Sequence, residues 1–224
     1  VPYIVSLHDL TQLDQDDFLS RAAAVTFSSP YLRDRYQMPG DIVAPGISVA
    51  PAPSPARNRG IAFAGAVQRH KGGHLLPAIA DALRKRGETL HVFGRGDGDL
   101  LRALRAKHNV KLHGYYRAGT LPLLLQRHGI GLMLVPSIVP EAFCLTISEA
   151  WAAGAAVAAF DVGAQGERIR QLGGGWVAPL ASGTEGMVEI IDRWQPVEIP
   201  REIPTAADAA RGYLDLYHRL GWLG

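Results

Sequence analysis

Residues 130–160 read I-G-L-M-L-V-P-S-I-V-P-E-A-F-C-L-T-I-S-E-A-W-A-A-G-A-A-V-A-A-F, and this stretch decides the fold. An apolar run ends at Pro136, a helical pattern opens near Cys144 and closes at Gly154, and a second apolar run covers residues 156–160. Strands that are apolar throughout, instead of alternating, are typical of a parallel sheet that is buried on both faces. The stretch therefore predicts a strand, helix and strand of an α/β protein.

The same alternation extends over residues 60–195. Short apolar segments predict strands at 61–64, 91–93, 110–112, 130–135, 156–160 and 176–177. Helical patterns between and after them cover 74–86, 100–107, 121–128, 145–153, 167–172 and 183–194. Six strands linked by helices of this length predict a Rossmann-like, doubly wound parallel sheet.

The segments on either side of this region differ in character. Residues 2–7 and 22–27 are two further apolar strands, too few for a covered sheet, so we expect residues 1–48 to be a partial N-terminal domain. The chain begins with Val1 and not Met, and we expect a longer parent chain or a partner subunit to supply the rest. Residues 49–59 are Pro-rich and predict a linker. Residues 196–224 predict a crossing segment and a final amphipathic helix.

Composition narrows the classes of function. With 224 residues, 47% of them hydrophobic, the chain can bury a sizeable core. A net charge of +2, without Lys and Arg runs interleaved with aromatics, argues against a nucleic-acid partner. The single Cys144 rules out an internal disulfide and favours a reducing compartment, so we expect a cytoplasmic protein. No apolar run is long enough to span a bilayer and no signal peptide is found, which leaves peripheral membrane contact open.

Two carboxylates eight residues apart, Glu141 and Glu149, mark a candidate ligand site. Between them the helix start leaves unpaired N–H groups, which with the helix dipole favour an anion. Each carboxylate can accept two hydrogen bonds from a vicinal diol, so a nucleotide sugar fits the spacing, although such Glu residues are most often solvated surface charges. The N–H groups that we expect to take part are those of Phe143, Cys144, Leu145 and Thr146.

The segment P-E-A-F-C-L-T-I-S-E-A-W-A-A-G (140–154) resembles the E-x7-E segment of the retaining family-4 glycosyltransferases, which have the two-domain GT-B fold. The resemblance continues through residues 155–164, which are similar to the family's buried strand and following loop. It implies that residues 60–195 are the C-terminal, donor-binding domain. It also implies that Glu141 contacts the donor sugar, that the intervening amides contact the sugar and diphosphate, and that Glu149 binds the ribose.

Loops after other strands carry the resemblance further. Gly65, Lys71 and Gly72 match the family's G-R-x-x-x-x-K-G loop, whose Arg and Lys clamp the diphosphate. Ala66 stands at the Arg position, and Arg69 could substitute only from a different position. I-V-S-L-H-D (4–9) resembles the segment whose His reaches the donor sugar. The resemblance thus implies His8, Glu141 and Lys71 as catalytic residues, and Gly65, Arg69, Lys71, Gly94, Tyr115 and Tyr116 as donor-binding residues, with the two tyrosines near the nucleobase.

The resemblance implies a hexosyltransferase-type enzyme that moves a sugar from a nucleotide-diphosphate donor to a carbohydrate or lipid-linked acceptor hydroxyl, with retention of configuration. Polysaccharide or glycoconjugate assembly is the family's commonest role. No cofactor and no metal are expected, because Lys71 and the helix amides can stabilise the leaving phosphate. Two alternatives stay open: a nucleotide-sugar binding module without turnover on its own, suggested by Ala66 and the short N-terminal part, and a GT-B-fold nucleotide-sugar epimerase. UDP and GDP are both open as the nucleotide.

Overall fold

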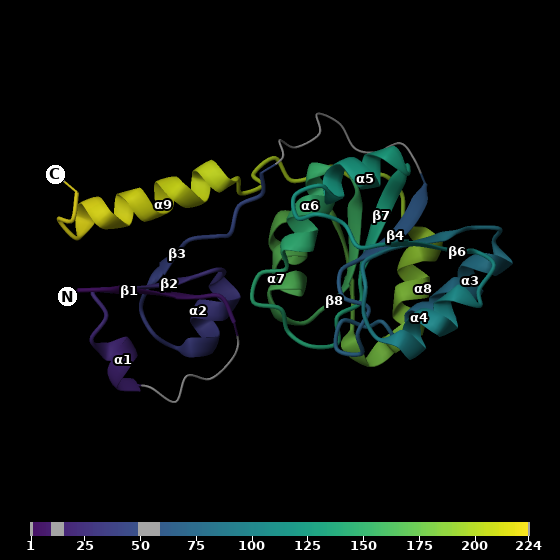
Figure 1. Ribbon diagram of the computed structural model, residues 1–224, viewed down its shortest axis with the longest axis horizontal. Helices are drawn as coiled ribbons and strands as arrows, with labels where there is room; N and C mark the ends of the chain where they lie inside the picture. Colours follow the sequence, from purple (N-terminus) through teal and green to yellow (C-terminus); the bar gives the residue numbers. More distant parts are fainter. Residues whose placement is uncertain (1, 10–15, 49–58, 224) are drawn as a thin grey trace.

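The computed structural model of the protein describes residues 2–9, 16–48 and 59–223, which form two separate parallel sheets (Figure 1). The larger sheet has six strands in the order β6-β5-β4-β7-β8-β9, and the smaller has three in the order β1-β2-β3. Helices cover both faces of the larger sheet (Figure 1). The predicted linker lies outside the described residues, apart from Arg59.

All six strands predicted after Gly60 are present, and every neighbouring pair is parallel. The Rossmann-like α/β fold is therefore confirmed. The strand order reverses between β4 and β7, which is the switch point where ligands bind in open sheets of this kind. The strands are β4 (Gly60–Ala64), β5 (Leu90–Phe93), β6 (Val110–Gly114), β7 (Ile130–Val135), β8 (Ala156–Phe160) and β9 (Gly175–Ala178).

Six helices and a short 3-10 turn connect and follow these strands. They are α3 (Leu76–Lys85), α4 (Gly98–Arg105), α5 (Leu121–Arg127), α6 (Leu145–Ala152), α7 (Gly163–Leu172) and α8 (Gly183–Arg193), with the turn at Leu180–Ser182. The predicted start of α7 at residue 167 is wrong by four residues. Gly163, at φ 60°, turns the chain from β8 directly into the helix, a conformation that other residues rarely adopt.

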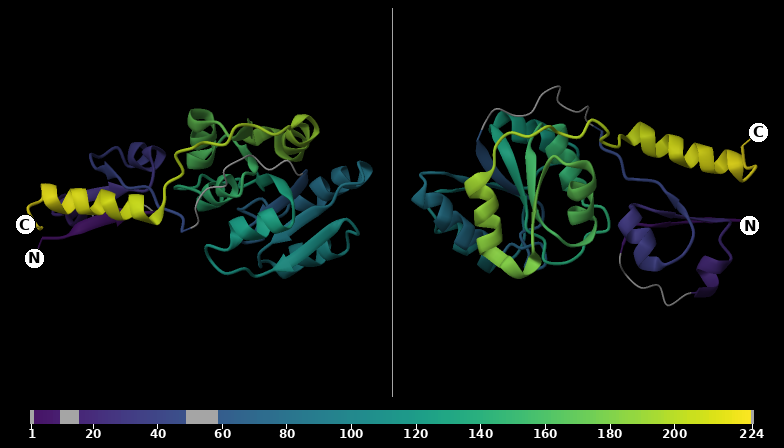
Figure 2. Two further views of the ribbon diagram at one scale, coloured as in Figure 1. Left: turned by 90° about the horizontal axis from the view of Figure 1, so that it is seen from above. Right: turned by 180° about the vertical axis from the view of Figure 1, so that it is seen from behind.

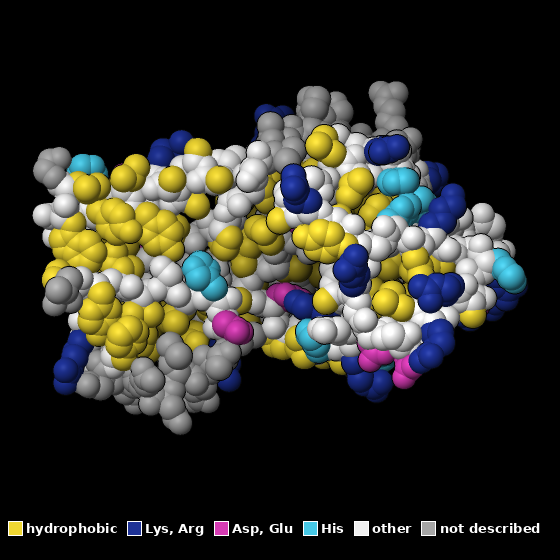
Figure 3. Space-filling view, viewed as in Figure 1, with side chains coloured by type: hydrophobic (Ala, Val, Ile, Leu, Met, Phe, Trp, Pro, Cys, Tyr) yellow, Lys and Arg dark blue, Asp and Glu magenta, His cyan; other side chains and the backbone are white. Residues whose placement is uncertain are grey.

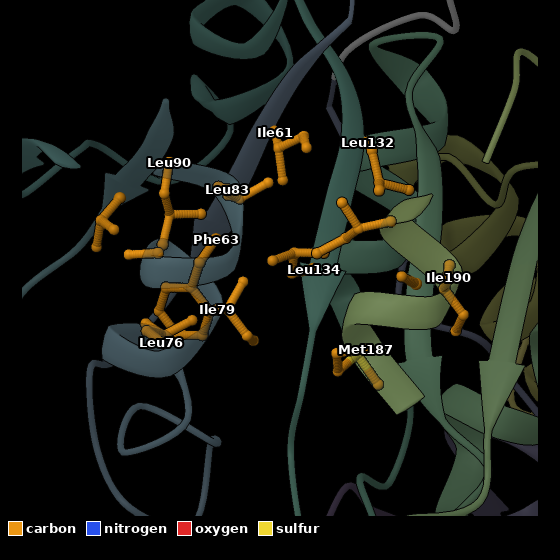
Figure 4. Close-up of a cluster of buried hydrophobic side chains, with 14 of the residues drawn as sticks. Ile61, Phe63, Leu76, Ile79, Leu83, Leu90, Leu132, Leu134, Met187 and Ile190 are labelled. Atoms are coloured by element: carbon orange, nitrogen blue, oxygen red, sulfur yellow. The ribbon is translucent and has the colours of Figure 1, made fainter. Parts of the chain in front are cut away.

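Each face of the larger sheet has its own buried cluster of apolar side chains. On one face Leu76, Ile79 and Leu83 of α3 pack in a cluster with β4 and β5, and α8 covers β8 and β9 (Figure 4). On the other face Trp151 of α6 packs in a cluster with α5. Because alternate residues of β4 enter the two clusters, its sequence is apolar at almost every position, as the sequence pattern indicated.

The smaller sheet consists of β1 (Ile4–Leu7), β2 (Ala24–Phe27) and β3 (Asp41–Ile42), with helices α1 (Asp16–Ser20) and α2 (Pro30–Tyr36). The prediction that the first two strands belong to a different sheet is confirmed. Ser29 caps α2 by accepting a hydrogen bond of 3.1 Å from the Leu32 N–H. This cap and the Pro at the first helical position agree with the sequence pattern.

The final helix, α9 (Ala206–Arg219), crosses back to the smaller sheet (Figures 1 and 2). Its Tyr213 hydroxyl lies 3.0 Å from the Ser6 hydroxyl, and its Arg219 pairs with Asp41 at 2.7 Å. A capping box of Thr205 and Asp208 starts the helix. Among the described residues, no helix has the length and apolar character that crossing a membrane requires.

Candidate functional site

A cavity of about 280 Å³ lies at the carboxyl ends of β4 and β7, at the switch point of the larger sheet. Parallel strands end here, so loops from separate parts of the chain converge on one place. The space-filling view shows acidic and basic side chains in a hollow between the two halves of the molecule (Figure 3). The cavity is lined by Phe63, Ala64, Gly65, Ala66, Lys71, Leu134, Val135, Pro136, Ser137, Glu141, Cys144, Leu145 and Thr146.

Lys71 and Glu141 meet in this cavity. The Lys71 ammonium nitrogen lies 2.6 Å from Oε1 and 2.7 Å from Oε2 of Glu141. The side chains are 34% and 15% exposed, so the pair is partly shielded from water and its charges interact more strongly than on an open surface. An ammonium group has three N–H donors, and two here point to the carboxylate, which leaves one for another acceptor.

Gln165 of α7 holds the loop that carries Glu141. Its side-chain oxygen accepts a hydrogen bond of 2.9 Å from the Glu141 N–H, and its amide nitrogen donates to the Val139 carbonyl at 3.0 Å. The Ala164 N–H donates to the Glu141 carbonyl at 3.0 Å. Because Gln165 is completely buried, these bonds fix the position of the Glu141 backbone. The role of Gln165 could not be predicted from the sequence, because its only local signal is a polar side chain shortly after a buried strand.

The smaller sheet also contacts this loop. The hydroxyls of Ser28 and Ser29, directly after β2, donate to the Ala142 carbonyl at 3.3 Å and 2.5 Å. The Ser28 N–H in turn donates to the Leu7 carbonyl at 3.2 Å, so the end of β1 lies beside the same loop. The loop that carries Glu141 is thus held by both halves of the protein.

The start of α6 is supported from behind by Arg168. Its guanidinium donates to the carbonyls of Phe143 and Cys144, both at 3.0 Å, and to the Ser148 hydroxyl at 2.7 Å. It also lies 4.0 Å from the centre of the Phe143 ring. Burial lowers the pKa of Arg168 to about 10, which leaves it charged at neutral pH. Arg168, like Gln165, was missed because its role depends on tertiary position.

Cys144 has the backbone angles φ 64° and ψ 74°, in the left-handed region that favours glycine. This turn brings Cys144, Leu145 and Thr146 to the wall of the cavity, at the positive end of α6. Burial raises the pKa of the Cys144 thiol to about 12, so the group is protonated at neutral pH. A protonated thiol is a poor nucleophile, in keeping with a packing role.

Glu149 lines a second cavity, of about 340 Å³, which adjoins the first at Leu145. Its side chain is buried, with 7% of its surface exposed, and burial raises the pKa of its carboxyl group. The Gly119 N–H donates a hydrogen bond to that carboxyl group. Glu141 and Glu149 therefore occupy different cavities on either side of the start of α6. The second cavity is lined by Gly46, Ile47, Ser48, Ala118, Gly119, Thr120, Pro122, Leu145 and Glu149.

Tyr115 and Tyr116 line a third cavity, of about 430 Å³, which adjoins the second at Thr120. Tyr115 is 69% exposed, and the Arg95 guanidinium lies 5.4 Å from the centre of its ring. Burial, and the nearby negative charge of Glu149, raise the pKa of Tyr116 to about 12. Neighbouring cavities thus share a lining residue, and the three form a series that begins at Lys71 and Glu141, passes Glu149 and ends at the two tyrosines.

Two of the predicted site residues have different surroundings. Arg69 is exposed, and Ala66, not Arg69, is among the lining residues of the first cavity. His8 is exposed directly after β1, and it is not among the residues described as lining the three cavities. The roles predicted for Arg69 and His8 stay predictions.

Gly65 and Gly94 allow the ends of β4 and β5 to approach each other beside the first cavity. The Gly65 N–H donates to the Phe93 carbonyl at 2.9 Å, and the Gly94 N–H donates to the Gly114 carbonyl at 2.7 Å. A Cβ atom on Gly94 would lie 1.8 Å from the Gly65 carbonyl oxygen, and Gly94 has φ 143°. Both the contact and the backbone conformation therefore require glycine at residue 94.

We expect Gly94→Ala to lower the free energy of unfolding by at least about 1–3 kcal/mol, because it adds backbone strain and a collision with Gly65. Gly98→Ala is the matched control, since a Cβ atom there would meet nothing within 4 Å and φ is not in the left-handed region. Urea denaturation measures both variants. Equal stabilities would contradict the close approach at Gly94.

Comparison with known proteins agrees with this description. Residues 58–194 match the family model of Glycosyl transferases group 1. No curated protein matches the chain. Anabaena HepE in complex with UDP and glucose aligns with a TM-score of 0.72 and 19% identity, over 99% of this chain and 72% of HepE.

Two other solved structures have the same fold. Sucrose-phosphate synthase from Thermosynechococcus elongatus aligns with a TM-score of 0.74 and 19% identity, over 97% of this chain and 67% of that protein. The pneumococcal O-GlcNAc transferase GtfA, in complex with UDP and GlcNAc, aligns with a TM-score of 0.70 and 16% identity, over 98% of this chain and 52% of GtfA. The protein has the fold of a GT-B glycosyltransferase. Since the family match spans more than half of the sequence, the chain belongs to Glycosyl transferases group 1.

Proposed function

We propose that the protein binds a nucleotide-diphosphate sugar along the three adjoining cavities and transfers the sugar to an acceptor hydroxyl with retention of configuration. The observation that carries this proposal is the series itself. An ion pair beside a helix N-terminus is followed by a buried carboxylate and then by two tyrosines. A nucleotide sugar presents sugar and diphosphate, ribose and base in that same order.

Charge supports the assignment of each group. The diphosphate would lie against the amides of Leu145 and Thr146, where the helix dipole is positive, and accept a hydrogen bond from Lys71. Glu141 would accept hydrogen bonds from hydroxyls of the sugar. Glu149 would accept hydrogen bonds from the ribose hydroxyls. These hydroxyls would replace the water molecules that the buried Glu149 carboxylate has lost.

Retention would result if the leaving phosphate accepts the proton of the acceptor hydroxyl on the face where attack occurs. The C1–oxygen bond to the phosphate breaks, the bond from C1 to the acceptor oxygen forms, and the nucleoside diphosphate leaves with the proton. Lys71 and the α6 amides would stabilise the negative charge that develops on the phosphate. On this mechanism Glu141 positions the sugar, and we expect transfer without a metal ion.

The relatives suggest which donors to try first. HepE was solved with UDP and glucose, and GtfA with UDP and GlcNAc. We therefore propose UDP-sugars as the first candidates and GDP-sugars as the second, in a cytoplasmic step of polysaccharide or glycoconjugate assembly.

We expect the correct nucleotide to stabilise the protein against heat, because a ligand at 100 times its Kd adds about 2.7 kcal/mol to the free energy of unfolding. The experiment is a thermal-shift panel of UDP, GDP, ADP and CMP. Product analysis then follows with the sugar donors of the base that binds. ATP at the same concentration is the control for nonspecific phosphate binding. If all nucleotides shift the melting temperature equally or not at all, the proposed site is wrong.

A second candidate is a donor-binding chain that turns over poorly by itself. Ala66 lines the cavity at a position where the resemblance implies an Arg, and the chain spans 52% of GtfA and 72% of HepE. On this account nucleotide affinity is normal and the transfer rate is far below the usual range of about 1–10³ s⁻¹. The same product analysis separates the candidates, and an epimerised free sugar among the products would indicate the epimerase alternative.

A further inference from the structure

Three histidines that the proposed function does not use lie together at the outer end of the larger sheet. They are His91 on β5, His113 on β6 and His128 directly after α5. Each histidine offers one ring nitrogen, and these three nitrogens all lie within 4.8 Å of one another. His91 Nδ1 lies 3.0 Å from His113 Nε2. His side chains lie next to each other on the face of the larger half shown in Figure 3.

The fold fixes this arrangement through rigid elements. β5 and β6 are adjacent and parallel, and their register shifts so that Val92 pairs with Leu112 and Phe93 with Gly114. His113 is therefore the additional residue of a bulge, a feature that redirects a side chain. Its ring stacks on Phe93, with ring centres 4.2 Å apart, and lies 4.3 Å from that of His128.

The surroundings favour nitrogen ligation over an ordinary ion pair. His91 is buried, with 9% of its surface exposed, and the other two histidines are half-buried. The described charged groups that act on His91 and His113 are all basic, namely Lys111 and the neighbouring histidines. Three imidazoles without a carboxylate are unsuited to Mg²⁺ or Ca²⁺, which prefer oxygen, and suited to Zn²⁺ and similar ions.

The distances are close to those of a tetrahedral site. Zn–N bonds of about 2.0–2.1 Å place the ligand nitrogens of a tetrahedral site about 3.3–3.4 Å apart. The His91–His113 pair at 3.0 Å is near this value, and the third nitrogen lies within 4.8 Å of both, so ring rotations have to bring it closer. His113 and His128 also line the third cavity, which can supply a water molecule as fourth ligand.

We propose that His91, His113 and His128 bind a divalent transition-metal ion of the Zn²⁺ type, with solvent as the fourth ligand. The site is separate from Lys71 and Glu141, but two of its histidines line the cavity that is proposed for the base. Metal binding is therefore measured without nucleotide, so that its outcome does not depend on the proposed transfer reaction.

The test uses the whole chain after dialysis against a chelator, titrated with Zn²⁺ in competition with a chromogenic chelator. We expect one tight equivalent, and Co²⁺ in its place should give the strong visible absorption of a tetrahedral site. Because loss of even an outer-shell partner costs about 10–100-fold in metal affinity, His128→Ala should weaken binding by at least that factor. His91→Phe, which keeps a flat ring in the stack, should do the same, with folding checked by circular dichroism.

His108→Ala is the matched control, because His108 is exposed after α4 and is outside the cluster. It should leave the affinity unchanged. The proposal is overturned if the wild-type chain binds no tight equivalent of Zn²⁺. It is also overturned if folded His128→Ala and His91→Phe bind as tightly as the wild type.

Discussion

Lys71→Ala should reduce the rate of sugar transfer by about a hundredfold to a thousandfold, the usual effect of removing one group that stabilises charge on a transition state. Among the described residues that line the first cavity, Lys71 supplies the positively charged side chain. It lies at the positive end of α6. Without the Lys71 ammonium, only the α6 amides remain to stabilise the negative charge on the leaving phosphate. Nucleotide affinity should fall less, by about 10–100-fold, since one hydrogen bond to a charged group is worth about 1.5–3 kcal/mol.

The measurement is kcat/KM for the donor together with the nucleotide Kd by calorimetry. Lys107→Ala is the matched control, because Lys107 also forms an ion pair, at 2.6 Å to Asp81, but lies outside the cavity. It should leave both constants within about twofold. A Lys71→Ala protein that transfers sugar at the wild-type rate would remove Lys71 from the mechanism.

Glu149→Gln should have two opposite effects, a weaker nucleotide complex and a more stable protein. The loss of a charged acceptor for the ribose should weaken nucleotide binding by about 10–100-fold. Burial raises the pKa of Glu149, so the folded protein binds this proton more tightly than the unfolded chain does. Near neutral pH the ionised carboxylate therefore destabilises the fold, and stability is gained as the pH falls through the raised pKa. The neutral amide removes this penalty.

Calorimetry with the nucleotide and thermal unfolding at several pH values test both effects. The melting temperature of Glu149→Gln should exceed that of the wild type near pH 7, and the difference should shrink toward acid pH. Glu189→Gln, on the exposed side of α8, serves as the control and should change neither quantity. A variant that loses stability but binds nucleotide normally would show that Glu149 is a structural residue.

The larger sheet could be predicted because its strands are short and apolar on both faces, a pattern that survives without knowledge of the tertiary structure. The start of α7 could not be predicted, because its first turn contains glycines and Gln165 and lacks an apolar helical pattern. Gln165 is required there by its hydrogen bond to the Glu141 loop, which only the tertiary structure reveals. The docking of α9 on the smaller sheet joins Ser6 to Tyr213, and no local pattern connects such distant residues.

The candidate site was predictable to the same degree. The family resemblance implied that Lys71 and Glu141 share a site, and they do lie together, because they follow β4 and β7, which are neighbours at the switch point. Arg168 acts from behind the site and carries no motif. The histidine cluster could not be predicted, because its members lie on β5, on β6 and directly after α5, and their separation along the sequence matches no metal-binding spacing.

A structure of the protein crystallised with UDP or the nucleotide that the thermal-shift panel selects tests the central claim most directly. Our account predicts the diphosphate within hydrogen-bond distance of Lys71 and the Leu145 and Thr146 amides, with the ribose on Glu149 and the base beside Tyr115 and Tyr116. A nucleotide bound away from these three cavities, or one that leaves the Glu149 carboxylate without a ribose contact, would contradict it.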